Sequence, residues 1–90
     1  MRPNKIKQLW RDGKPATLAW LSVSHGFTAE IMARQGFDAL CIDLQHGTNE
    51  MNDVLPMLQA ISQTETVPFV RVAWNDPAPI MRALDLGAYG

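Results

Sequence analysis

Three short apolar segments recur along the chain, separated by stretches with the spacing of helices. The apolar segments are Thr17–Val23, Ala39–Leu44 and Val67–Val72. Each is almost continuously apolar rather than alternating, which is typical of strands that are buried on both faces of a parallel sheet. We therefore predict a β-strand in each segment.

The remaining stretches predict four helices. These are an amphipathic helix over Asn4–Arg11, a helix capped by Thr28 that runs through Gln35 to a stop at Gly36, a helix capped by Asp53 with Pro56 as its third residue, and a helix capped by Asp76 that stops at Gly87. Thr and Asp side chains accept hydrogen bonds from the free N–H groups of a first turn, and glycine tolerates the left-handed end. The last start is the clearest, because Pro77 follows its cap at a position that favours proline.

Alternating strands and helices predict an α/β fold with a parallel sheet and right-handed crossovers. Ala88–Gly90 come directly after the last predicted helix, where a fourth strand is expected to begin. Eight such units make about 250 residues, the usual size of a (β/α)8 barrel. We therefore expect residues 1–90 to be one partial domain: an N-terminal helix and the first three βα units of a TIM barrel, truncated before strand 4.

Charge and composition exclude several classes of partner. Eight Lys and Arg against nine Asp and Glu give a formal net charge of -1 without a basic cluster, which argues against nucleic acid. No apolar run approaches the roughly 18 residues of a membrane span, and no secretory signal is evident at the N-terminus. Cys41 is the only cysteine. We expect a cytoplasmic protein that does not bind membranes.

Polar residues gather where the predicted strands end, the edge at which parallel α/β proteins carry their chemistry. Asp43 and His46 stand at the end of the second strand, and Arg71 near the end of the third. Asp43 can cap the following loop through backbone N–H groups, or it can orient the His46 imidazole as a general base. Arg71 can form a salt bridge with Asp43 or Asp85, or it can hold a carboxylate or a developing enolate.

Several motifs together carry a resemblance to a known family. They are Gly36-Phe37-Asp38, Cys41-Ile42-Asp43-Leu44-Gln45-His46, Pro68-Phe69-Val70-Arg71-Val72 and Leu84-Asp85-Leu86-Gly87-Ala88. In combination they resemble the HpcH/HpaI aldolase family, the class II pyruvate aldolases of the 4-hydroxy-2-oxoheptanedioate aldolase type. The resemblance covers essentially the whole chain, from the loop Gly13-Lys14-Pro15 onwards.

The resemblance implies a lyase that cleaves 4-hydroxy-2-oxo acids to pyruvate and an aldehyde. It implies a TIM barrel, a divalent metal such as Mg or Mn, and a homo-oligomer, usually a hexamer. His46 with Asp43 would be the acid/base pair, and Arg71 would hold pyruvate and stabilise its enolate. Trp20 would line the substrate pocket, and Asp85 would be a supporting carboxylate of the active site.

Two departures from the family pattern bear on the metal. Many relatives carry Glu immediately before the histidine, whereas this chain has Gln45. Its neutral amide can bind substrate or a metal-bound water but brings no charge. The metal-ligating carboxylates of the family come from later strands, so no metal ligand is assigned in this chain, and we expect residues 1–90 to be inactive alone.

Two alternatives remain beside the aldolase. One is the acyl-CoA lyase branch of the same superfamily, which resembles citrate lyase β subunits and malyl-CoA lyases. The other is a non-catalytic fragment or interaction module. The loop Trp74-Asn75-Asp76-Pro77 resembles the aldolase branch more closely than the acyl-CoA branch.

Overall fold

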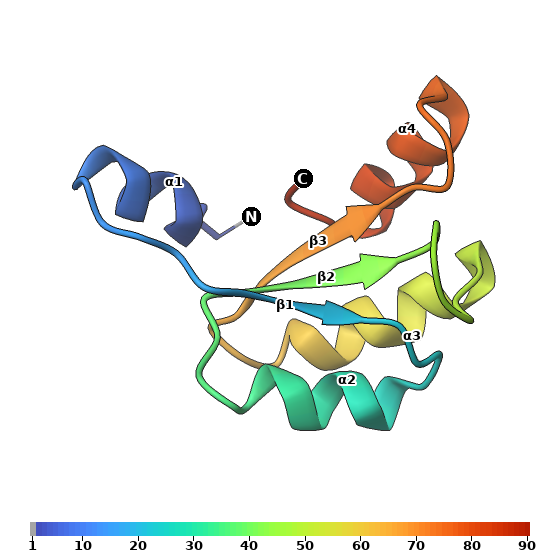
Figure 1. The fold of residues 1–90 in the computed structure, drawn as a ribbon, viewed down its shortest axis with the longest axis horizontal. Coiled ribbons are helices and arrows are strands. Elements are labelled where there is room, and N and C mark those ends of the chain that lie inside the picture. The colour runs from blue at the N-terminus through green and yellow to red at the C-terminus, as the bar shows by residue number, and fades with distance from the viewer. Residues whose placement is uncertain (1) are drawn as a thin grey trace.

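Helices and strands alternate in the computed structural model, which describes residues 2–90, in the order that the sequence pattern predicts. The elements are α1 (Lys5–Arg11), β1 (Leu18–Leu21), α2 (Gly26–Ala33), β2 (Ala39–Asp43), α3 (Met51–Ile61), β3 (Val67–Arg71) and α4 (Pro77–Leu86). The three strands form one parallel sheet in the order β1-β2-β3 (Figure 1). The predicted α/β class, the four helices and the parallel sheet are therefore confirmed.

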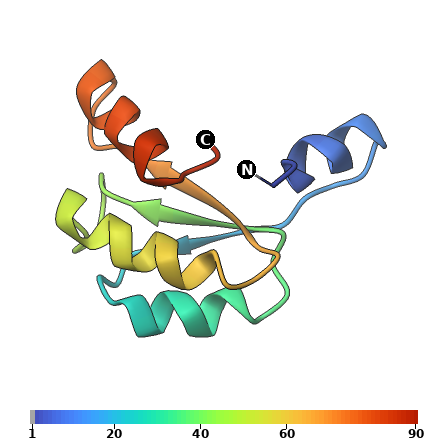
Figure 2. The same cartoon turned by 180° about the vertical axis from the view of Figure 1, so that it is seen from behind.

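Helices α2 and α3 lie side by side against one face of the sheet, as both views show (Figures 1 and 2). The core between these layers is formed by apolar side chains of β1, β2 and the two helices. Its largest fully buried members are Leu40, Ile42, Val54, Met57 and Ile61. Burial of this interface, rather than helix propensity, is the main source of stability for such short helices.

Helix α1 packs at the end of the sheet where the strands begin (Figure 1). Ile6 of α1 is buried against Ala39 and Val67, the first residues of β2 and β3, and Tyr89 packs against the same cluster. The opposite end of the sheet, where the strands stop, is left to the loops.

Residues 88–90 run along the outer edge of β3. The Tyr89 N–H donates to the Pro68 carbonyl at 2.9 Å, and the Val70 N–H donates to the Gly90 carbonyl at 3.0 Å. Residue numbers rise in the same direction along both segments from one bond to the next, so the pairing is parallel. The segment after α4 therefore occupies the position that the next parallel strand would take.

The helix caps correct two of the expected helix starts. Helix α2 begins at Gly26 and is capped by His25, whose Nδ1 accepts from the Phe27 N–H, rather than by Thr28. Helix α3 begins at Met51, because Glu50 and Asp53 form a reciprocal capping box, and Pro56 consequently lies inside the helix.

The cap of α4 matches the prediction. Asp76 accepts from the Ala78 N–H, Pro77 opens the helix, and Gly87 ends it in the left-handed conformation with φ of 118°. The longest helix of residues 2–90 has only 11 residues. None of the helices in this part of the chain is long and apolar enough to cross a bilayer.

Candidate active site

Alternation along the strands divides their side chains between two faces of the sheet. Leu21, Leu40 and Ile42 belong to the core beneath α2 and α3. Because successive residues of a strand point to opposite faces, their neighbours Trp20 and Asp43 point to the face opposite α2 and α3. Arg71 is the register partner of Asp43 and therefore shares this face.

Asp43 and Arg71 form a two-point ion pair across neighbouring strands. Arg71 Nε donates to Asp43 Oδ1 at 2.9 Å, and Nη2 donates to Oδ2 at 2.7 Å. Asp43 is only 3% exposed, whereas the Arg71 side chain is 37% exposed. The parallel fork fixes the plane of the guanidinium, since two N–H groups and two carboxylate oxygens must align at once.

This pair shifts the proton affinity of both groups. The hydrogen bonds from Arg71 hold the pKa of Asp43 far below its ordinary value, and the backbone N–H groups of Gln45 and His46 add to this effect against the opposing effect of burial. The hydrogen bonds to Asp43 in turn raise the pKa of Arg71. The pair therefore stays ionised throughout the pH range in which most proteins are folded.

Trp20 of β1 lies against the guanidinium of Arg71, which stands on β3, two strands away. The Arg71 Cζ atom is 4.5 Å from the centre of the Trp20 ring, within the range of a cation–π contact. Trp20 itself remains 51% exposed. None of the hydrogen bonds within residues 2–90 uses Nη1 of Arg71, so this nitrogen can donate to a ligand.

His46 lies on the exposed loop between β2 and α3. Its backbone N–H, like that of Gln45, donates to Asp43 Oδ1, at 3.2 and 3.0 Å respectively. The hydrogen bonds of residues 2–90 include none between the imidazole and the Asp43 carboxylate. Asp43 thus caps the loop and pairs with Arg71, which are the structural alternatives that the sequence left open. It binds His46 through the backbone N–H of that residue rather than through the imidazole.

The remaining sequence candidates lie apart from this cluster or have other tasks. Asp85 is exposed in the last turn of α4, shortly before the segment that pairs with the beginning of β3, so the structure does not bring it near Asp43 and His46. His25 caps α2. Cys41 is buried, and burial raises the pKa of its thiol to about 11, which makes it a poor nucleophile.

Sequence reasoning missed one polar residue at this edge. Asn49 is 6% exposed, and its Nδ2 donates to the carbonyls of Leu21 at 2.7 Å and Asp43 at 3.1 Å. It stands in a polar stretch of sequence without helical or strand periodicity. Nothing in that pattern distinguishes it from a solvated loop residue.

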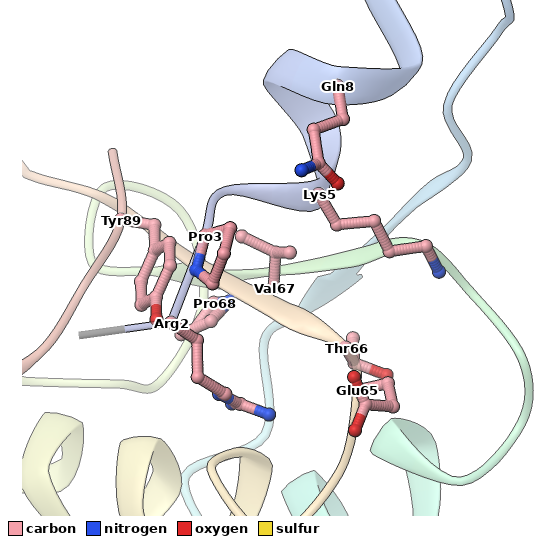
Figure 3. Close-up of a pocket in the computed structure, with 9 residues that line it drawn as sticks. All are labelled: Arg2, Pro3, Lys5, Gln8, Glu65, Thr66, Val67, Pro68 and Tyr89. Atoms are coloured by element: carbon pink, nitrogen blue, oxygen red, sulfur yellow. The ribbon is translucent and has the colours of Figure 1, made fainter.

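A cavity of about 270 Å³ lies at the opposite end of the sheet (Figure 3). It is lined by Arg2, Pro3 and Lys5 from the start of the chain and by Pro68 and Tyr89 from β3 and the segment after α4. The Arg2 guanidinium donates to the Thr64 carbonyl. Neither Trp20, Asp43, His46 nor Arg71 lines this cavity, so it is separate from the candidate site at the C-terminal ends of the strands.

The described residues do not supply a metal site. No group of three or more His, Cys, Asp or Glu side chains in residues 2–90 is arranged to hold a metal ion. Asp43, the buried carboxylate of the cluster, is already occupied by four donors. The chemistry that these residues can perform is anion binding by Arg71 and proton transfer by His46.

A model of the HpcH/HpaI aldolase/citrate lyase family matches residues 16–90. The chain belongs to this family. Its curated relatives include the hydroxypyruvate/pyruvate aldolase of Rhizorhabdus wittichii, 45% identical over 87 residues, which are 97% of this chain and 35% of the relative. The 4-hydroxy-2-oxo-heptane-1,7-dioate aldolase of Salmonella dublin is 41% identical over 85 residues, which are 94% of this chain and 32% of that protein.

A solved structure of an HpcH/HpaI aldolase/citrate lyase family protein from Burkholderia cenocepacia has the same arrangement. It superposes with a TM-score of 0.85 at 40% identity, over 96% of this chain and 35% of that one. The chain thus spans about a third of the length of the relatives that it matches. Family membership supports an enzyme of the lyase kind.

The lowered pKa of Asp43 predicts how the ion pair responds to acid. A carboxyl pKa that is lower in the folded than in the unfolded state, where it is about 3.9, stabilises the fold above that value and loses this effect as the pH falls toward the folded pKa. The advantage of the wild-type chain over Asp43→Asn in the free energy of unfolding is therefore expected to be full above about pH 5 and to shrink below about pH 4.

Urea denaturation at several pH values measures this difference. Asp85→Asn is the matched control, because it removes an exposed carboxylate and is expected to change the free energy of unfolding by less than about 0.5 kcal/mol. An advantage over Asp43→Asn that stays constant from neutral pH into the acid range would contradict the ion pair.

Proposed function

We propose that the protein is a carbon–carbon lyase that cleaves 4-hydroxy-2-oxo acids to pyruvate and an aldehyde. One observation carries this proposal: a guanidinium at the end of β3 whose plane is fixed by Asp43 and Trp20 and whose Nη1 makes no hydrogen bond to residues 2–90. Such a group suits a carboxylate or an enolate oxygen, because its position is set before the ligand arrives. The names of two curated relatives support the same substrate class.

The reaction requires a base and a group that stabilises an enolate. Removal of the proton from the 4-hydroxyl lets the bond between C3 and C4 break, which releases the aldehyde and leaves its electron pair on the enolate of pyruvate. Protonation of the enolate at C3 then gives pyruvate. Arg71 would bind the 2-oxo acid and balance the negative charge of the enolate, which is where a preorganised cation has its largest effect.

His46 is the proposed proton-transfer residue. It is an exposed imidazole on the same edge as Arg71, and the bond from its backbone to Asp43 ties its loop to the ion pair. Asp43 would act as the positioning residue for both groups rather than as a direct partner of the imidazole. Within residues 2–90 the side chain of Gln45 makes a single long hydrogen bond, of 3.5 Å to the Ala73 carbonyl, so it would remain available to a substrate.

We also propose that residues 2–90 are the first three βα units of a (β/α)8 barrel. The pairing of residues 88–90 with β3 supports this arrangement, because it places the next segment at the open edge of the sheet. Trp20, Asp43 and Arg71 would then line the interior of the barrel at the ends of its strands. The family resemblance implies that the carboxylates binding any divalent metal of the complete protein would come from later strands, and residues 2–90 contain no group of three or more His, Cys, Asp or Glu arranged to hold one.

Substitution of Arg71 by Lys tests the proposed function. Lysine keeps the charge but loses the planar fork and the free N–H groups, so turnover of a 4-hydroxy-2-oxo acid in the full-length protein is expected to fall roughly a hundred- to a thousandfold. Pyruvate release is the measurement, and Arg34→Lys, at the exposed C-terminal cap of α2, is the matched control. Full activity of the Arg71→Lys variant, or release of a CoA thioester product instead of pyruvate, would overturn the assignment.

The two histidines of the chain are expected to separate catalysis from stability. His46→Ala removes the proposed acid/base group and should lower turnover by roughly 100- to 10,000-fold with little change in melting temperature. His25→Ala removes the cap of α2 and should cost about 0.5–2 kcal/mol of stability while turnover is retained. Turnover and melting temperature are measured for both variants. The reverse pattern would make His46 a structural residue.

Trp20 is expected to affect substrate binding more than turnover. Loss of a partly exposed cation–π contact is worth about 0.5–1 kcal/mol, so Trp20→Ala should raise KM roughly two- to fivefold. Trp20→Phe keeps an aromatic face and should lie between the wild type and the alanine variant. Steady-state kinetics measure this, with Trp10→Ala on α1 as the control at the other end of the sheet. An unchanged KM in Trp20→Ala would show that the stacking does not help to position Arg71.

A further inference from the structure

Asn49 joins the ends of two strands by a single side chain. Its Nδ2 donates to the carbonyl of Leu21, the last residue of β1, and to that of Asp43, the last residue of β2. A primary amide offers two N–H donors from one nitrogen, whereas a hydroxyl offers one and a carboxylate none. Among short side chains, asparagine is therefore the one that can hold both carbonyls.

The loop between β2 and α3 is fixed on both sides of His46. Before it, Asp43 Oδ1 accepts the His46 N–H. After it, the N–H and the Oγ1 of Thr48 both donate to the Ser22 carbonyl, at 3.2 and 2.9 Å, and Asn49 follows with its two bonds. Gly47 packs so closely that a Cβ there would lie 3.0 Å from the Cβ of Ser22. Only the short stretch that carries the imidazole projects from these attachments.

Asn49 combines two satisfied donors with one unsatisfied acceptor. Asn49 Oδ1 is buried and makes no hydrogen bond to any of residues 2–90, and a buried acceptor without a partner lowers stability. An apolar side chain of similar size would avoid this cost, but it would leave the carbonyls of Leu21 and Asp43 without these two donors and would release both strand ends. The two bonds of Asn49 therefore set the geometry of the strand ends as well as satisfying their carbonyls.

We propose that Asn49 is the positioning residue of the catalytic loop, which sets the place of His46 relative to Arg71 by locking the β2–α3 loop onto the end of β1. This inference rests on the proposed function, because it takes His46 as the proton-transfer residue. Asn49 touches neither the imidazole nor the guanidinium. It acts through the backbone carbonyls of the two strands that carry Trp20 and Asp43.

The experiment compares Asn49→Leu and Asn49→Asp with Asn52→Ala, an exposed asparagine of α3, in the full-length protein. Leucine fills a similar volume and removes both donors, and aspartate sets a carboxylate against two carbonyls. Both variants are expected to lower kcat roughly 10- to 100-fold, as loss of a residue that orients a reacting side chain does, with KM for the 2-oxo acid unchanged. The Asn52→Ala variant should match the wild type.

Amide hydrogen exchange gives a readout that does not depend on activity. The His46 N–H should exchange faster in the Asn49 variants, while the Tyr89 N–H, bonded to Pro68 at the other end of the sheet, should keep its wild-type rate. If the wild type releases no pyruvate, the proposed function fails, but the exchange experiment still decides the role of Asn49. Wild-type exchange at His46 or wild-type kcat in Asn49→Leu would overturn the proposal, as would failure of Asn49→Leu to fold.

Discussion

The candidate site depends on one ion pair, the fork between Asp43 of β2 and Arg71 of β3. The pair exists because the parallel register sets these two residues opposite each other on the face of the sheet that α2 and α3 leave free. A shift of one residue in this register would turn one of the two side chains into the apolar core. The packing of Leu40 and Ile42 against the helices therefore fixes the polar pair as well, since alternate residues of the same strand serve the two purposes.

Asp43 connects the two groups that the proposed reaction needs. Its Oδ1 accepts from Arg71 Nε and from the backbone N–H groups of Gln45 and His46, and its Oδ2 accepts from Arg71 Nη2. A buried carboxylate is costly unless its lone pairs are satisfied, and here four donors satisfy them. The guanidinium of Arg71 and the loop that carries His46 are thus both hydrogen-bonded to the same carboxylate, so a change at Asp43 affects the position of both.

The parts of the structure that follow from local chemistry could be predicted from the sequence. Apolar runs gave the three strands, and Asp76 with Pro77 gave the start of α4, because strand burial and helix capping depend on neighbouring residues. The start of α2 was mistaken, because His25 uses a ring nitrogen as a cap where a hydroxyl of Thr28 was expected. The partners of Asp43 and the bridging amide of Asn49 were not decided by the sequence, since both depend on which strand ends meet in space.

The site divides its tasks between strands and a loop. Trp20, Asp43 and Arg71 stand on strands, where the sheet holds them, and in the proposed reaction their role is electrostatic: they would bind and orient an anion. His46 stands on a loop, where its imidazole would accept and donate a proton. That loop is attached to two strand ends by Asp43, Thr48 and Asn49. Proton transfer demands a heavy-atom separation of about 2.6–3.2 Å, so a loop residue can serve it only when its backbone is held this closely. The polar attachments of the loop are therefore as much a part of the proposed reaction as the side chains that would touch the substrate.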